Sequence, residues 1–243
     1  GDFVITPSWT WHDHGNEGSG PMVWLDGLDM HVINMLAASF REDLGGKAHK
    51  LERPDGAAPA EFGNNLLPVD VTHRSQTSPI FNYPYRKSRE SLDTLARTRA
   101  LDPWHAHKMK FINPVNGGWA MPTISTWLQL LPKGFKTAPY RSTDGAIFTV
   151  VEGRGRSTVG GETFDWGPHD IFVAPSWAAH THQASEDAVL FIYSDRVIQE
   201  KLDLIGRLLI FTRQMDMLMT SETSVEAVAQ NFLQGNYSRN MEA

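Results

Sequence analysis

Two pairs of histidines carry the clearest chemical signal in this sequence. His12 and His14 are separated by one residue, and so are His180 and His182. Alternate residues of a β-strand point to the same face, so each pair would present two imidazoles side by side. Neutral imidazole is a good ligand for divalent first-row metals. The chain has no cysteine, which excludes thiolate nucleophiles and cysteine-based metal sites, so a metal would need histidines and carboxylates.

The two pairs lie in two copies of one sequence unit. Residues 2–14 read DFVITPSWTWHDH and residues 170–182 read DIFVAPSWAAHTH. Without a gap, six of the thirteen positions are identical, including the proline, the tryptophan and both histidines. Each copy reads as an apolar strand, a Pro-containing turn and an alternating segment that carries its histidines on one strand face. We interpret the unit as a duplicated β-structure.

The second copy lies within a series of short apolar segments separated by turn sequences such as PKG, EGRG and GGE. These segments predict strands within residues 124–131, 135–142, 146–153, 156–159, 162–166, 170–175 and 188–194. Evenly spaced short strands are typical of a β-barrel or β-sandwich.

Other segments predict different structures. Leu92 and Leu95 indicate a short amphipathic helix over 88–99 with Ser88 near its start, and a second helix is expected over 195–209, capped by Asp195. Residues 22–36 alternate loosely, which predicts one or two strands. Residues 40–64 are polar and rich in Gly, Ala and Pro, as in a linker or surface loop.

The overall composition excludes two classes of partner. The formal net charge is −6, so the chain lacks the basic surplus that nucleic-acid binding requires. No apolar run approaches the roughly 20 residues of a membrane span. Hydrophobic residues make up 41% of the chain, enough to bury a core.

The first copy resembles the second sequence motif of the cupins, Gly-x5-Pro-x-Gly-x2-His-x3-Asn. Gly1, Pro7, His12 and Asn16 match it, with Trp9 in place of the internal glycine. The chain also resembles the gentisate 1,2-dioxygenase family of ring-cleaving iron enzymes in TPSWTWHDHGN, WLDGLD, NPVNGGWAMPTI and LLPKGFKTAPYRSTDGAIFTVVEGRG. This resemblance implies an all-β bicupin fold with a few peripheral helices.

The resemblance also implies a domain plan. Residues 1–45 would be the C-terminal half of a first, catalytic cupin, and 46–121 a linker and bridge. Residues 122–195 would be a second cupin without metal, and 196–243 a helical tail. The preceding cupin motif is not in this chain, so we expect the C-terminal two-thirds of a longer enzyme, inactive on its own.

The same resemblance assigns the site residues. His12 would be a ligand of Fe(II), and His14 a catalytic residue that hydrogen-bonds the substrate or moves protons. Asp26 would be a catalytic carboxylate that orients His14, whereas Asp29 would cap a turn. Trp9 and Trp11 read as packing residues at the barrel mouth.

In the second copy, alignment on the preceding cupin motif puts Tyr140 and Ser142 where two histidine ligands would be, and Ala146 at the glutamate position. His180 alone cannot hold iron, so we expect this barrel to be structural. His105 and His107 have the spacing of a metal motif, but Phe111 and Ile112 stand where its glutamate should be. We interpret that pair as belonging to a loop or strand edge.

The implied reaction is cleavage of gentisate by O2 to maleylpyruvate, with 1-hydroxy-2-naphthoate or salicylate as alternative substrates. The partners would be a small aromatic ortho-hydroxy acid and O2 in a cytoplasmic homo-oligomer, a tetramer by resemblance. Candidates for binding the substrate carboxylate are Arg74, Arg86 and Arg141. The competing class is a non-catalytic bicupin that binds a ligand.

Overall fold

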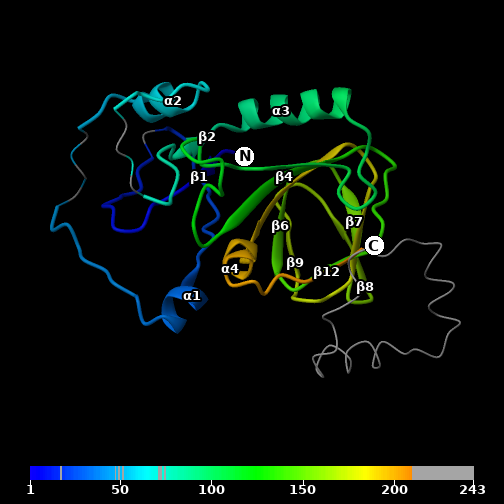
Figure 1. The fold of residues 1–243 in the computed structure, drawn as a ribbon. Coiled ribbons are helices and arrows are strands. Elements are labelled where there is room, and N and C mark those ends of the chain that lie inside the picture. The colour runs from blue at the N-terminus through cyan, green and yellow to red at the C-terminus, as the bar shows by residue number, and fades with distance from the viewer. Residues whose placement is uncertain are drawn as a thin grey trace, which may run out of the picture.

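Most strands of the chain form two five-stranded antiparallel sheets that enclose a barrel (Figure 1). The structure, a computed structural model, describes residues 1–209 except positions 17, 47, 49, 51, 71, 72 and 74. One sheet has the order β3-β4-β11-β6-β9, formed by His107–Lys110, Ser125–Leu131, Ala188–Ser194, Ala146–Glu152 and Ile171–Ala174. The other has the order β12-β5-β10-β7-β8, formed by Arg207–Leu209, Tyr140–Ser142, His180–Ala184, Gly155–Val159 and Glu162–Trp166.

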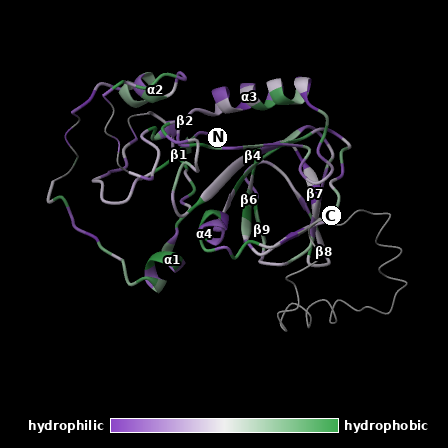
Figure 2. Ribbon diagram, in the orientation of Figure 1, coloured by the Kyte–Doolittle hydropathy of each residue, from purple (hydrophilic) through white to green (hydrophobic). Residues whose placement is uncertain are grey.

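The core lies between these sheets. Phe148 on β6 stacks on Phe172 on β9 with ring centroids 4.9 Å apart, and Leu190 and Ile192 of the central strand β11 are buried beside them. Figure 2 shows the apolar character of β6 and β9. The predicted all-β architecture is confirmed, and each predicted barrel segment contains a strand.

A 14-residue helix, α3 (Tyr85–Thr98), covers the outer face of β4. Leu92 on the helix packs with Leu128 and Leu130 of β4, which explains why β4 is buried on both of its faces. The predicted helix is therefore confirmed, but it starts earlier than Ser88. The Asp2 carboxylate accepts a hydrogen bond of 2.8 Å from the backbone N–H of Tyr85, and so satisfies a donor of the first turn.

The remaining elements lie beside the barrel in Figure 1. Strand β1 (Phe3–Val4) pairs with β2 (Asn82–Tyr83), and two short helices, α1 (Met30–Met35) and α2 (Ala57–Phe62), occur in the segment between them. Among the described residues of 1–45, β1 and α1 are the elements of regular structure. None of the helices in the described ranges is long and apolar enough to cross a membrane.

The strand prediction for residues 22–36 is wrong. The segment contains α1 and no strand. A strand needs a neighbouring strand for its backbone N–H and C=O groups, whereas a helix satisfies them internally. Asp29 stands at the N-cap of α1, and its carboxylate accepts a hydrogen bond from Thr123 instead of capping the helix.

The helix prediction for residues 195–209 is correct only at its start. Helix α4 runs from Arg196 to Lys201, and Asp203 then adopts a positive φ of 55°, which a helix does not allow. The chain returns as β12 and pairs with β5. Beside this pairing the Thr143 backbone N–H donates to the Gly206 carbonyl, and the Gly206 N–H donates to the Thr143 hydroxyl. The predicted tail beyond residue 209 lies outside the described residues.

The two copies of the repeated unit share an unusual backbone turn. Trp9 and Trp177 both have φ of 64°, in the left-handed region that non-glycine residues rarely adopt. After this turn the copies diverge: residues 180–184 form β10, but residues 10–16 form no strand. The predicted strand carrying His12 and His14 is therefore absent, because no neighbouring strand lies beside it in the described structure.

Candidate functional site

The first histidine pair lies on an exposed loop, with both rings in contact. The ring centroids of His12 and His14 are 5.5 Å apart and the rings are nearly perpendicular, at 86°. The Trp24 ring stacks on His14, with ring centroids 5.2 Å apart and an interplanar angle of 10°. The sequence thus correctly predicts that these two histidines lie together, although a loop and not a strand holds them.

Two anchors fix the ends of the segment that carries this pair. At its start, Phe3 packs against Phe111 and Phe191 on the outside of the barrel, with centroid distances of 4.8 and 5.3 Å. Ile5 is buried, and its backbone N–H donates to the Phe81 carbonyl at 2.8 Å. Beyond the pair, the bond from Thr123 to Asp29 ties the chain back to the barrel.

The other predicted residues of this site are less closely joined to it. Asp26 is exposed and makes no hydrogen bond or ion pair with any described residue, so its role in orienting His14 stays a prediction. Trp9 and Trp11 are both exposed. Trp9 is 84% exposed and its ring stacks on that of Phe40, with ring centroids 5.2 Å apart.

The arginine candidates lie elsewhere or outside the described residues. Arg86 is exposed on α3, and Arg141 lies over the Trp177 ring at 5.6 Å beside the turn of the second copy. Arg74 lies outside the described residues.

The residues described do not by themselves make up a metal centre. No group of three or more His, Cys, Asp or Glu side chains in the described part of the chain is placed to hold a metal ion. His12 and His14 could supply imidazole ligands, but an iron ion held by protein needs further donors. The loop therefore fits only part of an iron site.

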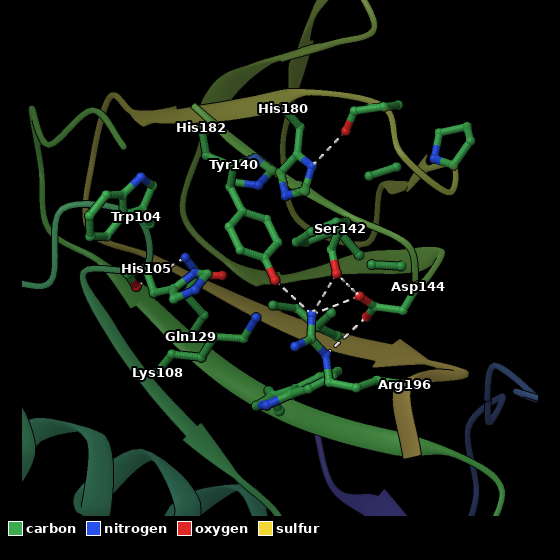
Figure 3. A pocket seen from close by; sticks show the side chains of 17 residues that line it. Trp104, His105, Lys108, Gln129, Tyr140, Ser142, Asp144, His180, His182 and Arg196 are labelled. Atoms are coloured by element: carbon green, nitrogen blue, oxygen red, sulfur yellow. Dashed lines mark hydrogen bonds and ion pairs between the residues drawn. The ribbon is translucent and has the colours of Figure 1, made fainter. Parts of the chain in front are cut away.

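The second histidine pair lies inside the barrel, next to a small cavity (Figure 3). His182 is buried, its Nδ1 lies 2.7 Å from the Ser157 hydroxyl, and that hydroxyl accepts a bond of 2.8 Å from Trp166. His180 packs on Tyr140 with centroids 5.3 Å apart. The predicted ligand-replacing residues Tyr140 and Ser142 do face this cavity.

A buried ion pair contacts Tyr140 and Ser142, the residues at the expected ligand positions. The Arg196 guanidinium donates to both carboxylate oxygens of Asp144, at 2.7 and 3.1 Å, and also to Tyr140 Oη at 2.7 Å and Ser142 Oγ at 3.1 Å. Burial alone would raise the pKa of Asp144, but Arg196 and the Ser142 and Ser194 hydroxyls hold that pKa below its usual value. A fixed arginine beside this position repels a metal cation.

The histidines around this cavity are kept neutral. Burial is the main cause: it lowers the pKa of His180 to about 4 and that of His182 well below its usual value. Burial, together with the nearby Lys108 ammonium, lowers the pKa of His105 to about 2.

His105 and Lys108 are residues of this cavity that the sequence did not reveal. The pair His105 and His107 does lie at a strand edge, as predicted: His107 begins the edge strand β3. His105, however, enters the barrel cavity and packs on Tyr140 at 5.0 Å. Since β3 pairs with β4, residues 107–110 belong to the barrel sheet and not only to a bridge.

The two-sheet barrel is that of a cupin, and the comparisons agree. The family described as "Cupin domain" matches residues 127–194. The chain is 51% identical over 202 residues to gentisate 1,2 dioxygenase 1 of Aquipseudomonas alcaligenes, covering 83% of this chain and 58% of that protein. It is 34% identical over 206 residues to 5-aminosalicylate 1,2-dioxygenase of a Comamonas species, covering 84% and 54%.

A solved structure extends this similarity. The salicylate 1,2-dioxygenase of Pseudoaminobacter salicylatoxidans, solved with gentisate, superposes with a TM-score of 0.80 at 29% identity, over 86% of this chain and 59% of that one. Residues 127–194 therefore form a domain of the cupin type. Over most of its length the chain is similar to the gentisate 1,2-dioxygenases, and it spans 58% of the length of the relative it matches at 51% identity.

Proposed function

We propose that this chain is part of a ring-cleaving dioxygenase that converts gentisate and O2 to maleylpyruvate with Fe(II) as cofactor. The observation that carries the proposal is the 51% identity to a gentisate 1,2-dioxygenase over 202 residues, which is 83% of this chain. The reaction breaks the ring bond between C1 and C2 and adds both atoms of O2 to the product.

In this proposal His12 is one ligand of the iron, and the other ligands are not among the residues that the structure describes. Fe(II), when bound, would supply the site for O2 and for the carboxylate and hydroxyl of the substrate. His14 would donate or accept a proton at the substrate or oxygen. Its stacking on Trp24 holds the ring in place, and Asp26 two residues further on would orient it.

The assay also has to identify the substrate, since the relatives named above are dioxygenases of different ortho-hydroxybenzoates. The test is oxygen uptake by the Fe(II)-loaded full-length enzyme of which this chain is part, with gentisate, salicylate and 1-hydroxy-2-naphthoate in parallel. We expect the fastest uptake with gentisate, together with a product that absorbs in the near ultraviolet. Faster turnover of another member of the panel would change the substrate assignment.

No uptake with any of the three acids would overturn the enzymatic proposal and favour the non-catalytic bicupin. The replacement His31→Ala provides a control in the same assay, because His31 is an exposed histidine on α1 in the same segment. Its activity should equal that of the unmodified protein.

The proposed homo-oligomer, a tetramer, is tested separately by sedimentation of the same preparation.

A further inference from the structure

The barrel cavity contains a cation that the protein does not neutralise. Lys108 lines the cavity, and its Nζ lies over the Trp127 ring at 4.6 Å. Within the described residues the ammonium makes no hydrogen bond to protein, and no carboxylate lies within ion-pair distance of it. An ammonium removed from water without acceptors is strongly unfavourable.

The other charged groups around the cavity leave this charge in excess. Arg196 is paired with Asp144 through two hydrogen bonds, so that pair is close to neutral. The neighbouring histidines are kept neutral by burial. The other carboxylate whose charge influences Lys108 is that of Asp102, which raises the pKa of Lys108 at a distance and without a hydrogen bond. The fixed charges facing the cavity therefore sum to one positive charge when Lys108 is protonated.

A second donor faces the same space. The Tyr140 oxygen accepts a hydrogen bond from Arg196, and its own hydroxyl proton has no acceptor among the described residues. Figure 3 shows Tyr140, Arg196 and Lys108 projecting into the cavity from different elements. The volume of the cavity is about 20 Å³, which leaves room for one or two water molecules and no more.

We propose that the barrel cavity binds a small monovalent anion, of halide or formate size, between the Lys108 ammonium and the Tyr140 hydroxyl. The site lies in the barrel that holds the second histidine pair. It needs neither iron nor the His12 loop, so it stands or falls independently of the proposed dioxygenase activity. The small volume excludes sulfate and aromatic acids, and the single excess charge favours a monovalent ion.

Binding of the anion should depend on the protonation of Lys108. Burial, with Arg196 as the next cause, lowers the pKa of Lys108 to about 7, while Asp144 and Asp102 act in the opposite direction. The anion is bound by the charged form. Its affinity should therefore fall about tenfold for each pH unit above the pKa of the anion-free protein.

The experiment is thermal unfolding of the full chain with bromide as probe, replacing gluconate at constant ionic strength. Bromide should raise the unfolding temperature with the logarithm of its concentration once that concentration exceeds the Kd, by roughly 5–10 °C at 100 times the Kd. Lys108→Met should abolish this rise. Lys110→Met is the matched control, since Lys110 lies two residues along β3 with its Nζ 5.2 Å from the Trp119 ring and is exposed. Its response should match that of the unmodified protein.

Two further measurements decide between a bound anion and bound water. Tyr140→Phe, which removes one donor, should weaken bromide binding about tenfold. A bromide-soaked crystal should show an anomalous peak beside Lys108 Nζ. A cavity that holds only water in that crystal, or an equal bromide response in the Lys108→Met variant, would overturn the proposal.

Discussion

The two copies of the repeated unit differ most in the surroundings of their histidines. His12 and His14 follow the shared turn into an exposed loop, where their main contacts are with each other and with Trp24. His180 and His182 follow the same turn into β10, inside a barrel where burial keeps them neutral. The local sequence sets the turn and the spacing of the imidazoles. The neighbouring strands set whether those imidazoles are buried in a core or exposed on a loop.

The largest expected difference between the copies concerns iron. In the full-length Fe(II)-loaded enzyme, His12→Ala should abolish iron retention and oxygen uptake, because it removes a proposed ligand. His180→Ala should leave both unchanged, because Arg196 and Tyr140 occupy the space around His180. Metal analysis after gel filtration, together with an oxygen electrode, measures the two effects. Equal losses in both variants would show that the wrong barrel was assigned.

The next largest expected effect concerns the stability contributed by two ion pairs of the barrel, one buried and one exposed. Asp144→Asn should destabilise the protein by about 3–5 kcal/mol, because it leaves the Arg196 guanidinium buried without its counter-charge. Asp165→Asn is the matched control: its pair with Arg156 on the barrel surface is equally short, at 2.7 Å, but solvent screens it.

Urea unfolding at pH 7 measures the free energy of unfolding of both variants. We expect the Asp165→Asn variant to unfold close to the unmodified protein. A small effect of Asp144→Asn would mean that the hydroxyl groups around Arg196 are sufficient to stabilise its charge.

The sequence predicted those parts of the structure that depend on local pattern. The strands β4, β6 and β11 have continuous apolar or alternating sequences, and the repeated turn at Trp9 and Trp177 follows from their shared proline and serine. These features can be predicted without knowing which distant segments they pair with in the fold.

The features that the sequence did not reveal depend on pairing across the fold. Strand β12 exists because β5 offers it backbone partners, and residues 10–16 form no strand because none lies beside them. The cavity residues Lys108 and Arg196 come from an edge strand and a helix that lie outside the repeated unit in sequence. Their meeting point is a property of the closed barrel, which composition and spacing do not contain.

The smallest expected effect concerns the response to acid of a buried histidine in the second copy, compared with an exposed histidine outside the barrel. An unfolded histidine has a pKa of about 6.5, whereas burial lowers that of folded His180 to about 4. Between these values the unfolded state binds the extra proton, so stability falls as the pH falls, by at most about 1.4 kcal/mol per pH unit for this residue. His180→Gln should reduce that slope, measured by urea unfolding between pH 7 and 5. His31→Gln, on the exposed helix α1, should keep the original slope. Identical slopes for His180→Gln and the unmodified protein would show that His180 does not contribute to the acid sensitivity of the barrel.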